Sequence, residues 1–138
     1  MNSQYAIAVH VLSLISLYPN SAASSEDIAA SVGVHPVIVR NVSGMLRRAG
    51  LLQTQQGVAG ARLTRKPEHI TLLEVYRAVG GPNSVFRLHE RPNPNCPVGA
   101  HIQTTLEDVF ADAQAALEAR LASVTLHDVA SRIVQRAG

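Results

Sequence analysis

The stretch that decides the fold spans residues 24–52 and reads SSEDIAASVGVHPVIVRNVSGMLRRAGLL. Ser24 is a favoured helix N-cap residue, and Glu26 follows in the first turn, where negative charge meets the positive end of the helix dipole. Gly33 ends this short helix, and Pro36 starts the next one at a position where a backbone N–H is not needed. Two helices joined through a glycine turn predict a helix-turn-helix.

The second of these helices covers residues 36–49 and is predicted to be amphipathic, with Gly50 as its cap. Its apolar stripe has the helical period and consists of Ile38, Val42, Met45, Leu46 and Ala49. Its opposite side is basic with short side chains, namely Arg40, Ser43, Gly44 and Arg47, flanked by Val37, Asn41 and Arg48. Because an α-helix fits the major groove of DNA, this side predicts a recognition helix.

Several side chains near this helix are suited to particular contacts with DNA. Arg40 can pair bidentately with guanine, and Asn41 can do the same with adenine. His35 and Ser43 can reach phosphates. The two arginines further along the helix are better placed for the DNA backbone than for bases.

A hairpin is predicted directly after the recognition helix. Residues 51–56 and 61–64 have the character of short strands, and the GVAG turn at residues 57–60 joins them with glycine at both ends. This hairpin is the wing, from which Gln56 or Arg62 can enter the minor groove. The predicted DNA-binding residues are His35, Pro36, Val37, Arg40, Asn41, Ser43, Gly44, Arg47, Arg48, Gln55, Gln56, Arg62 and Arg65.

The charge distribution also singles out this part of the chain. The first 66 residues hold six basic and two acidic residues, a net charge of +4, whereas the remainder holds six arginines and eight acids, a net charge of −2. No acidic residue lies between Val34 and Pro67. Such asymmetry fits a phosphate-binding face. It fits a solvated basic patch equally well, and charge alone does not decide between the two.

The remaining predicted elements, in chain order, are a helix over residues 2–18, a helix over 71–79, an ambiguous segment over 84–90 that one interpretation makes a strand, a loop over 91–96, a helix over 97–123 and a short final helix. The first helix is apolar almost all round, so it should be buried on more than one side. Capping-box spacing marks two helix starts, Thr71 with Glu74 and Thr125 with Asp128. We expect a DNA-binding domain over residues 1–82 and, in one compact unit with it, a linker, long helix and final helix over 83–138.

The helix over residues 97–123 is the longest in the chain. At 1.5 Å per residue it would extend about 40 Å, which is more than so small a core can cover. A partner helix from a second subunit is the economical explanation, so the protein is predicted to be a homodimer. The predicted dimerisation residues are Ile102, Leu106, Val109, Phe110, Ala113 and Leu117.

Composition excludes several classes of protein. The chain has 138 residues, of which 46% are hydrophobic and 16% charged, and this balance is typical of one globular protein. No apolar run has the length of a membrane span, and a single cysteine fits a reducing cytoplasm. Catalytic and nucleotide-binding motifs are absent, so we expect neither an enzyme nor a cofactor. His89, Cys96 and His101 come nearest to a metal site, but they flank a flexible loop and no metal is expected.

Cys96 allows two interpretations. It directly precedes Pro97, the expected first residue of the long helix, so its sulfur should lie at the positive helix end, where a thiol pKa is lowered. Cys96 is therefore a candidate redox sensor that would change the dimer geometry. The alternative is a small residue packed in a loop.

The chain resembles the Rrf-two family of bacterial winged-helix regulators over nearly its whole length. The matching segments are Ile28-Ala29 with Val32-Gly33-Val34, Val39-Arg40, residues 46–52 (LRRAGLL), the wing residues 57–63 (GVAGARL), residues 70–79 (ITLLEVYRAV) and residues 93–99 (NPNCPVG). The resemblance implies a homodimer in which long C-terminal helices cross and hold two winged domains toward a palindromic operator, often for repression.

Two departures from the family pattern narrow this expectation. Cluster-binding members carry three closely spaced cysteines before the dimer helix, whereas this chain has only Cys96, so it resembles the cluster-free branch. A switch between two thiols is excluded by the same count. Gln56 also stands where many members place an arginine before the first wing glycine, which leaves Arg62 as the substitute.

The sequence thus predicts a mainly α, winged helix-turn-helix regulator of transcription, with a two-stranded β wing and a long C-terminal dimerisation helix. It should bind double-stranded DNA as a homodimeric repressor, responsive to a redox or small-molecule signal. The alternative is a dimeric adaptor that uses the same fold to dock a protein partner. Steep salt dependence of duplex binding would favour the regulator, because counterion release sets that slope.

Overall fold

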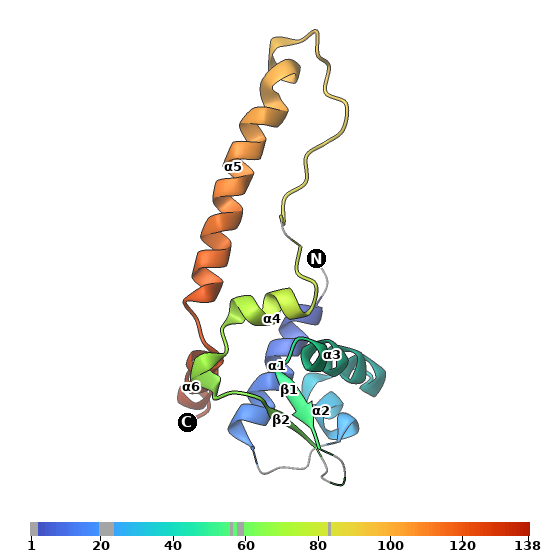
Figure 1. The fold of residues 1–138 in the computed structure, drawn as a ribbon, viewed down its shortest axis with the longest axis vertical. Coiled ribbons are helices and arrows are strands. Elements are labelled where there is room, and N and C mark those ends of the chain that lie inside the picture. Colours follow the sequence, from blue (N-terminus) through green and yellow to red (C-terminus); the bar gives the residue numbers. More distant parts are fainter. Residues whose placement is uncertain (1–2, 20–23, 56, 58–59, 83) are drawn as a thin grey trace. The chain divides into compact units, whose positions relative to one another are not determined.

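The structure is a computed structural model that describes residues 3–19, 24–55, 57, 60–82 and 84–138. It divides into two compact units, one formed by Met1–Gly81 with Ala122–Gly138 and the other by Pro82–Leu121. The described helices and strands are α1 (Gln4–Leu17), α2 (Ser25–Val32), α3 (Pro36–Arg48), β1 (Leu52–Thr54), β2 (Ala61–Leu63), the 3-10 turn η1 (Pro67–His69), α4 (Leu72–Ala78), α5 (Pro97–Ala122) and α6 (Leu126–Ala137) (Figure 1).

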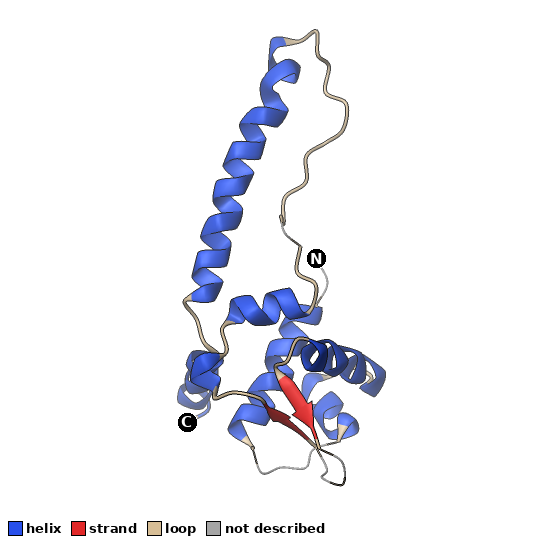
Figure 2. Cartoon of the chain, in the orientation of Figure 1, coloured by secondary structure: helices blue, strands red, loops and turns tan. Residues whose placement is uncertain are grey.

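The predicted fold class is confirmed, because helices dominate and the strands form one antiparallel hairpin (Figure 2). The first unit holds the hairpin together with α1, α2 and α3. Residues 84–90 differ from one interpretation of the sequence, since they form no strand in the structure. A lone strand there would have no partner for its backbone hydrogen bonds within the second unit, where the described residues hold only α5 and its preceding loop.

The final helix lies in the first unit, whereas the sequence grouped it with the long helix. Backbone hydrogen bonds explain this placement: the Leu72 N–H donates to the Val124 carbonyl at 2.9 Å, and the Leu126 N–H donates to the Ile70 carbonyl at 2.8 Å. They join the start of α6 to the start of α4. Such long-range pairing has no signature in the local sequence.

Helix starts follow the sequence signals closely. At the start of α2, Ser24 Oγ accepts from the Asp27 N–H at 3.2 Å, and the Asp27 carboxylate accepts from the Ser24 N–H at 3.1 Å. The same reciprocal box begins α4 at Thr71 and α6 at Thr125, so both predicted capping boxes are confirmed. Gly33 ends α2 with φ +82°, a left-handed conformation that favours glycine.

The core of the first unit surrounds α1. Leu12, Leu46, Leu51, Ile70 and Leu126 are fully buried, and they come from α1, α3 and the segments before β1, α4 and α6. Because α1 contacts α2, α3, α4, α6 and β2, its nearly continuous apolar surface is covered on several sides, as predicted. The unit therefore has one shared core, and α3 is anchored to it along one side.

The buried side of α3 differs from the predicted stripe. Val39 is 1% exposed and packs in the core with Val42 and Leu46, whereas Ile38 is 37% exposed and Ala49 is also exposed. The prediction that Ile38 and Ala49 face inward was therefore wrong. Both residues lie on the edge of the same apolar arc, and contact with α1 selects the rotation that buries Val39 instead.

The second unit consists of the segment before α5 and most of α5 itself. Phe86 stacks on Phe110 with ring centroids 5.0 Å apart, and the Gln103 amide donates to the His89 carbonyl at 3.2 Å. Gln114 is the one residue of α5 that is buried in the described structure. No helix in the described part of the chain, α5 included, is long and apolar enough to cross a membrane.

Candidate DNA interface

Local structure at both ends positions α3. At its start, the Val37 N–H donates to His35 Nδ1 at 3.1 Å, and Pro36 occupies the first turn. At its end, the Leu51 N–H donates to the Leu46 carbonyl at 2.9 Å while Gly50 has φ +78°, which is a Schellman motif. His35 was predicted to reach a phosphate, and the structure occupies its Nδ1 with the helix cap, leaving Nε2 for any such contact.

The outward side of α3 carries the predicted basic residues in the open. Arg40, Arg47 and Arg48 are exposed, as is Asn41, and Val37 is 46% exposed between them. Pro36 and Ser43 are half-buried. Wet cationic side chains on a helix of rigid position are suited to the major groove and its phosphates.

An acidic residue of α2 meets this surface, which the sequence analysis did not anticipate. Arg40 Nη1 lies 3.6 Å from Glu26 Oε1, and the two side chains are 51% and 69% exposed. An exposed pair of this kind contributes little to folding, but it gives the Arg40 guanidinium a preferred direction. Only the packing of α2 against α3 brings the two residues together.

Gly44 is buried, although the sequence placed it on the exposed side. A Cβ built at Gly44 would lie 3.3 Å from Arg48 Nη1 and 3.9 Å from Arg47 Nη2, so the arginine side chains cover it. The helical position was predicted correctly, but the expected exposure was wrong. Arginine side chains are long enough to lie across a neighbouring turn of their own helix.

The wing pairs its strands in a register that identifies a further polar residue. Gln53 pairs with Arg62, and both are exposed, whereas Leu52 is buried opposite Leu63. The same face opens onto a hollow lined by Gln53, Gln55 and Arg62. Gln53 was missed in the sequence because its assignment depends on strand alternation and register. Gln56 was predicted to contact DNA and lies outside the described residues.

Arg65 is engaged by the protein itself. Its Nη2 donates to Glu74 Oε2 at 2.6 Å, and its Nη1 donates to the His69 carbonyl at 3.0 Å. Partial burial acts to raise the pKa of Glu74, but hydrogen bonds from Arg65 and Thr71 outweigh it and lower that pKa. Arg65 thus ties the segment after the wing to α4. The prediction of DNA binding at Arg65 remains a prediction, and the side chain has a structural role in addition.

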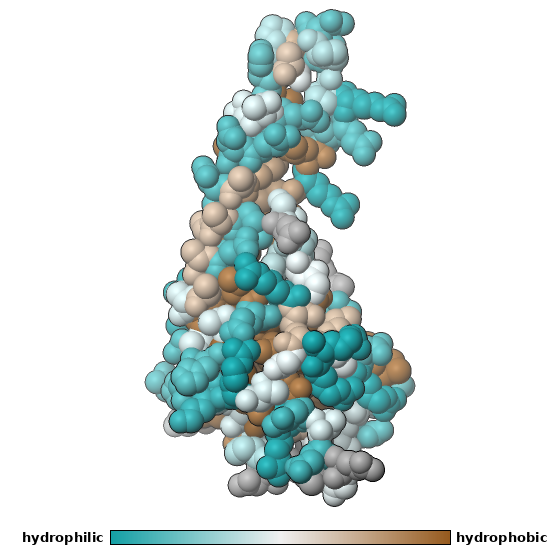
Figure 3. Space-filling view, viewed as in Figure 1, coloured by the Kyte–Doolittle hydropathy of each residue, from teal (hydrophilic) through white to brown (hydrophobic). Residues whose placement is uncertain are grey.

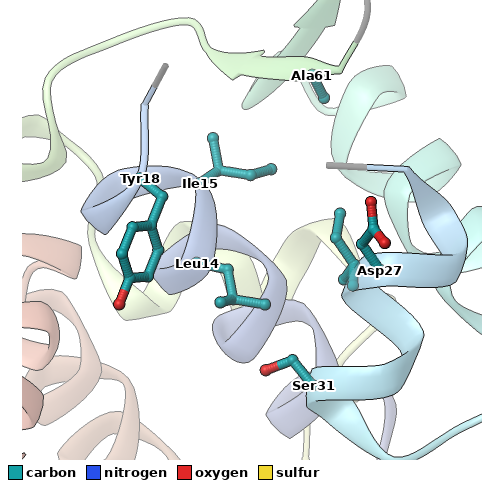
Figure 4. A pocket seen from close by; sticks show the side chains of 7 residues that line it. Leu14, Ile15, Tyr18, Asp27, Ser31 and Ala61 are labelled. Atoms are coloured by element: carbon teal, nitrogen blue, oxygen red, sulfur yellow. The ribbon is translucent and has the colours of Figure 1, made fainter. Parts of the chain in front are cut away.

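A small pocket lies where α1, α2 and β2 meet, with Tyr18 and Ile15 on one side and Asp27 and Ser31 on the other (Figure 4). Its volume is about 80 Å³. Two of its polar side chains already serve local structure, because Asp27 closes the α2 capping box and Ser31 Oγ lies 3.1 Å from His10 Nε2. We assign this pocket to packing behind the helix-turn-helix.

The helices, the hairpin and the exposed basic side of α3 agree with a known family model. The model for Rrf2, described as iron-dependent transcriptional regulators, matches residues 1–132. The chain belongs to the Rrf2 family. The resemblance seen in the sequence to this family, there called Rrf-two, is thereby confirmed.

Relatives of this Rrf2 chain include proteins named for transcription regulation. YwnA of Bacillus subtilis (strain 168), named as a candidate HTH-type transcriptional regulator, is 47% identical over 133 residues, which are 96% of this chain and 98% of YwnA. A crystal structure described as that of a candidate DNA-binding protein is 45% identical, with a TM-score of 0.74, and the match covers 92% of this chain and 98% of that one.

The fold extends to more distant members. CymR (YrzC), described as the global cysteine regulator of B. subtilis, has a TM-score of 0.73 at 21% identity, with 95% of each chain covered. These relatives are described as regulators or DNA-binding proteins and not as enzymes. The Rrf2 chain is therefore a transcription regulator with a DNA-binding fold and not an enzyme, as the sequence predicts.

The family description mentions iron, so the donor set of this chain needs a test. Iron–sulfur clusters are held by several cysteine thiolates, whereas the whole chain contains one cysteine. Within the described ranges, no three histidine, cysteine, aspartate or glutamate residues come together as metal ligands, and His89, Cys96 and His101 form no such group. The residues present do not fit an iron–sulfur cluster.

Cys96 lies at the N-terminal end of α5, as predicted, and is exposed. The backbone N–H groups of Gly99 and Val98 donate toward its sulfur and hold the pKa of the thiol below its ordinary value. The Cys96 carbonyl accepts from the Ala100 N–H at 2.8 Å, which continues the first turn. A role for this thiol in sensing stays a prediction.

Proposed function

We propose that this Rrf2 protein is a homodimeric repressor that binds a palindromic DNA operator. In this proposal α3 of each subunit enters a major groove, and the wing contacts the neighbouring minor groove. The α5 helices of the two subunits pack together and set the distance between the two α3 helices.

One observation carries the DNA part of the proposal, namely the wet, cationic outward side of α3. Arg40, Arg47 and Arg48 are exposed there, and no acidic residue occurs in the sequence between Val34 and Pro67. The α3 core residues face the other way, so DNA contact needs no rearrangement of the first unit. Phosphate contacts of this kind provide affinity, while Arg40 and Asn41 are the side chains suited to base edges.

The dimer part of the proposal is supported by the surface of α5. Along this helix Val109 is 54% exposed, and Ile102, Leu106, Ala113 and Leu117 are only half-buried within their own chain. Apolar residues follow α5 on the face shown in Figure 3. Apolar area left in water on a long helix favours burial against a second copy.

A two-fold dimer reads a two-fold site. If each α3 contacts one half-site, the half-sites should be centred about one helical turn of DNA, roughly 34–36 Å, or a multiple of it, apart. A palindrome then follows from the symmetry of the protein.

The proposal is tested by selecting bound fragments of the organism's genome with the purified full-length protein. We expect a sequence with inverted repeats, protection of both half-sites in footprinting, and a dimer mass in light scattering. A reporter under a promoter that contains the selected site should then be expressed more weakly when the protein is present. Failure to bind any duplex, or duplex binding that ignores salt, would refute the regulator and favour the protein-docking adaptor.

A further inference from the structure

A pocket in the second unit takes no part in the proposed contacts with DNA. It lies between the segment before α5 and α5 itself, and its volume is about 420 Å³. Its mainly apolar lining includes Phe86, Leu88, Phe110 and Ala111, with Gln114 and Glu107 as polar members. Small-molecule sites commonly have about 300–1,000 Å³ and a few polar groups among apolar walls.

Two aromatic rings form one wall of this pocket. Phe86 and Phe110 are stacked, with centroids 5.0 Å apart and planes inclined by 25°. Phe86 is 48% exposed, although a phenyl ring gains from burial. A flat aromatic molecule could cover the rings and add a further stacked contact.

Gln114 provides the polar feature that points to a ligand. The residue is 5% exposed, and its Oε1 accepts from the Val85 N–H at 3.1 Å. Its Nε2 is buried and has no hydrogen-bond partner within the described ranges of the chain. Buried donors without a partner are rare, because they lose hydration and gain nothing in return. The terminal torsion of glutamine is soft, so the amide can turn toward an acceptor at low cost.

The pocket also lies away from the proposed dimer contact. With 3.6 residues per turn, Glu107, Ala111 and Gln114 are separated from Leu106 and Val109 by roughly a third of a turn around α5. Dimerisation through the second group therefore leaves the first accessible. Phe110 lies between the two groups, and in the structure it faces Phe86.

We propose that this pocket binds an uncharged, flat aromatic molecule that carries a carbonyl oxygen. The aromatic part lies against Phe86 and Phe110, and the carbonyl accepts a hydrogen bond from Gln114 Nε2. Glu107 at the pocket disfavours an anion, and no lining residue is basic. A ligand here would tie the segment before α5 to the dimer helix. Its meaning as a regulatory signal rests on the proposed function, whereas the binding itself does not.

The test compares two probes of nearly equal shape, 1-acetonaphthone and 1-ethylnaphthalene, by calorimetry with the full-length protein. The ketone should bind about fivefold or more tightly than the hydrocarbon, as one hydrogen bond to a buried donor would give. Gln114→Leu should abolish that preference, and Gln114→Met repeats the test at conserved volume. Phe86→Ala should weaken the binding of both probes.

Gln103→Leu is the matched control, because this second glutamine of α5 donates to the His89 carbonyl and does not line the pocket. It should keep the preference for the ketone. Equal binding of the two probes to the wild type, or an unchanged preference in folded Gln114 variants, overturns the proposal. Each preparation is also tested on duplex DNA. Lost ketone binding with retained DNA binding refutes only the pocket, and the reverse refutes only the proposed function.

Discussion

Removing two arginines from the outward side of α3 should flatten the salt dependence of DNA binding. In the Arg47→Ala/Arg48→Ala variant, two exposed cations are lost from the surface that we assign to DNA phosphates. Each phosphate contact contributes about 0.9 to the slope of log affinity against log salt concentration, so two contacts contribute about 1.8. Between 50 and 200 mM salt, the wild type should therefore lose about twelvefold more affinity than the variant.

The structure makes this variant a clean test. Both side chains lie on the surface, and their guanidinium ends cover only Gly44. The core residues Val39 and Leu46 are untouched, so stability should change by no more than about 0.5 kcal/mol. Affinity is measured by fluorescence anisotropy with a labelled duplex at four salt concentrations between these limits.

Arg132→Ala/Arg136→Ala on α6 is the control, since it removes the same charge from two other exposed positions. It should keep the wild-type slope. The assignment of α3 to DNA phosphates is refuted if the α3 variant keeps the full slope, or if the α6 variant loses as much.

Four further outcomes follow from single sites. Leu46→Ala should lower the free energy of unfolding in urea by about 2–5 kcal/mol, because Leu46 is fully buried, and a loss below about 1 kcal/mol would contradict its place in the core. Hydrogen bonds at the α6 N-cap lower the pKa of Asp128, so its contribution to stability is present at neutral pH and is lost as the pH falls through that lowered value. The melting-temperature difference between wild type and Asp128→Asn should therefore shrink below about pH 4, and a constant difference would refute this. Alkylation of Cys96 by iodoacetamide should be half-maximal below pH ~8.5, the ordinary thiol value, and an oxidant that changes DNA affinity in the wild type should have no effect on Cys96→Ser. Glu26→Gln should release Arg40 and raise DNA affinity by up to about fivefold at low salt, whereas weaker binding would show that the pair orients Arg40 for its contact.

Much of the fold could be predicted from the sequence because its signals are local. A capping box joins residues three apart, so Thr71 and Thr125 mark the starts of α4 and α6 without knowledge of the rest of the chain. Gly33 and Pro36 similarly define the turn between α2 and α3. The basic side of α3 follows from helical spacing alone.

Other features depend on contacts between distant segments. The exact rotation of α3 places Val39 inside and Ile38 outside, and contact with α1 sets it. Arg65 finds Glu74 through a fold that brings the segment after the wing to α4. The second unit likewise buries Gln114 only because residues before α5 fold back on that helix.

The sequence by itself determined where helices begin and end, that α3 has one cationic side, and that one cysteine cannot assemble a cluster. Tertiary structure alone decided which apolar edge of α3 is buried, which arginine is paired, and which glutamine has lost its water. The physical reason is range: capping and periodicity act within one or two turns of backbone, whereas burial and ion pairing depend on surfaces that meet only when the chain is folded.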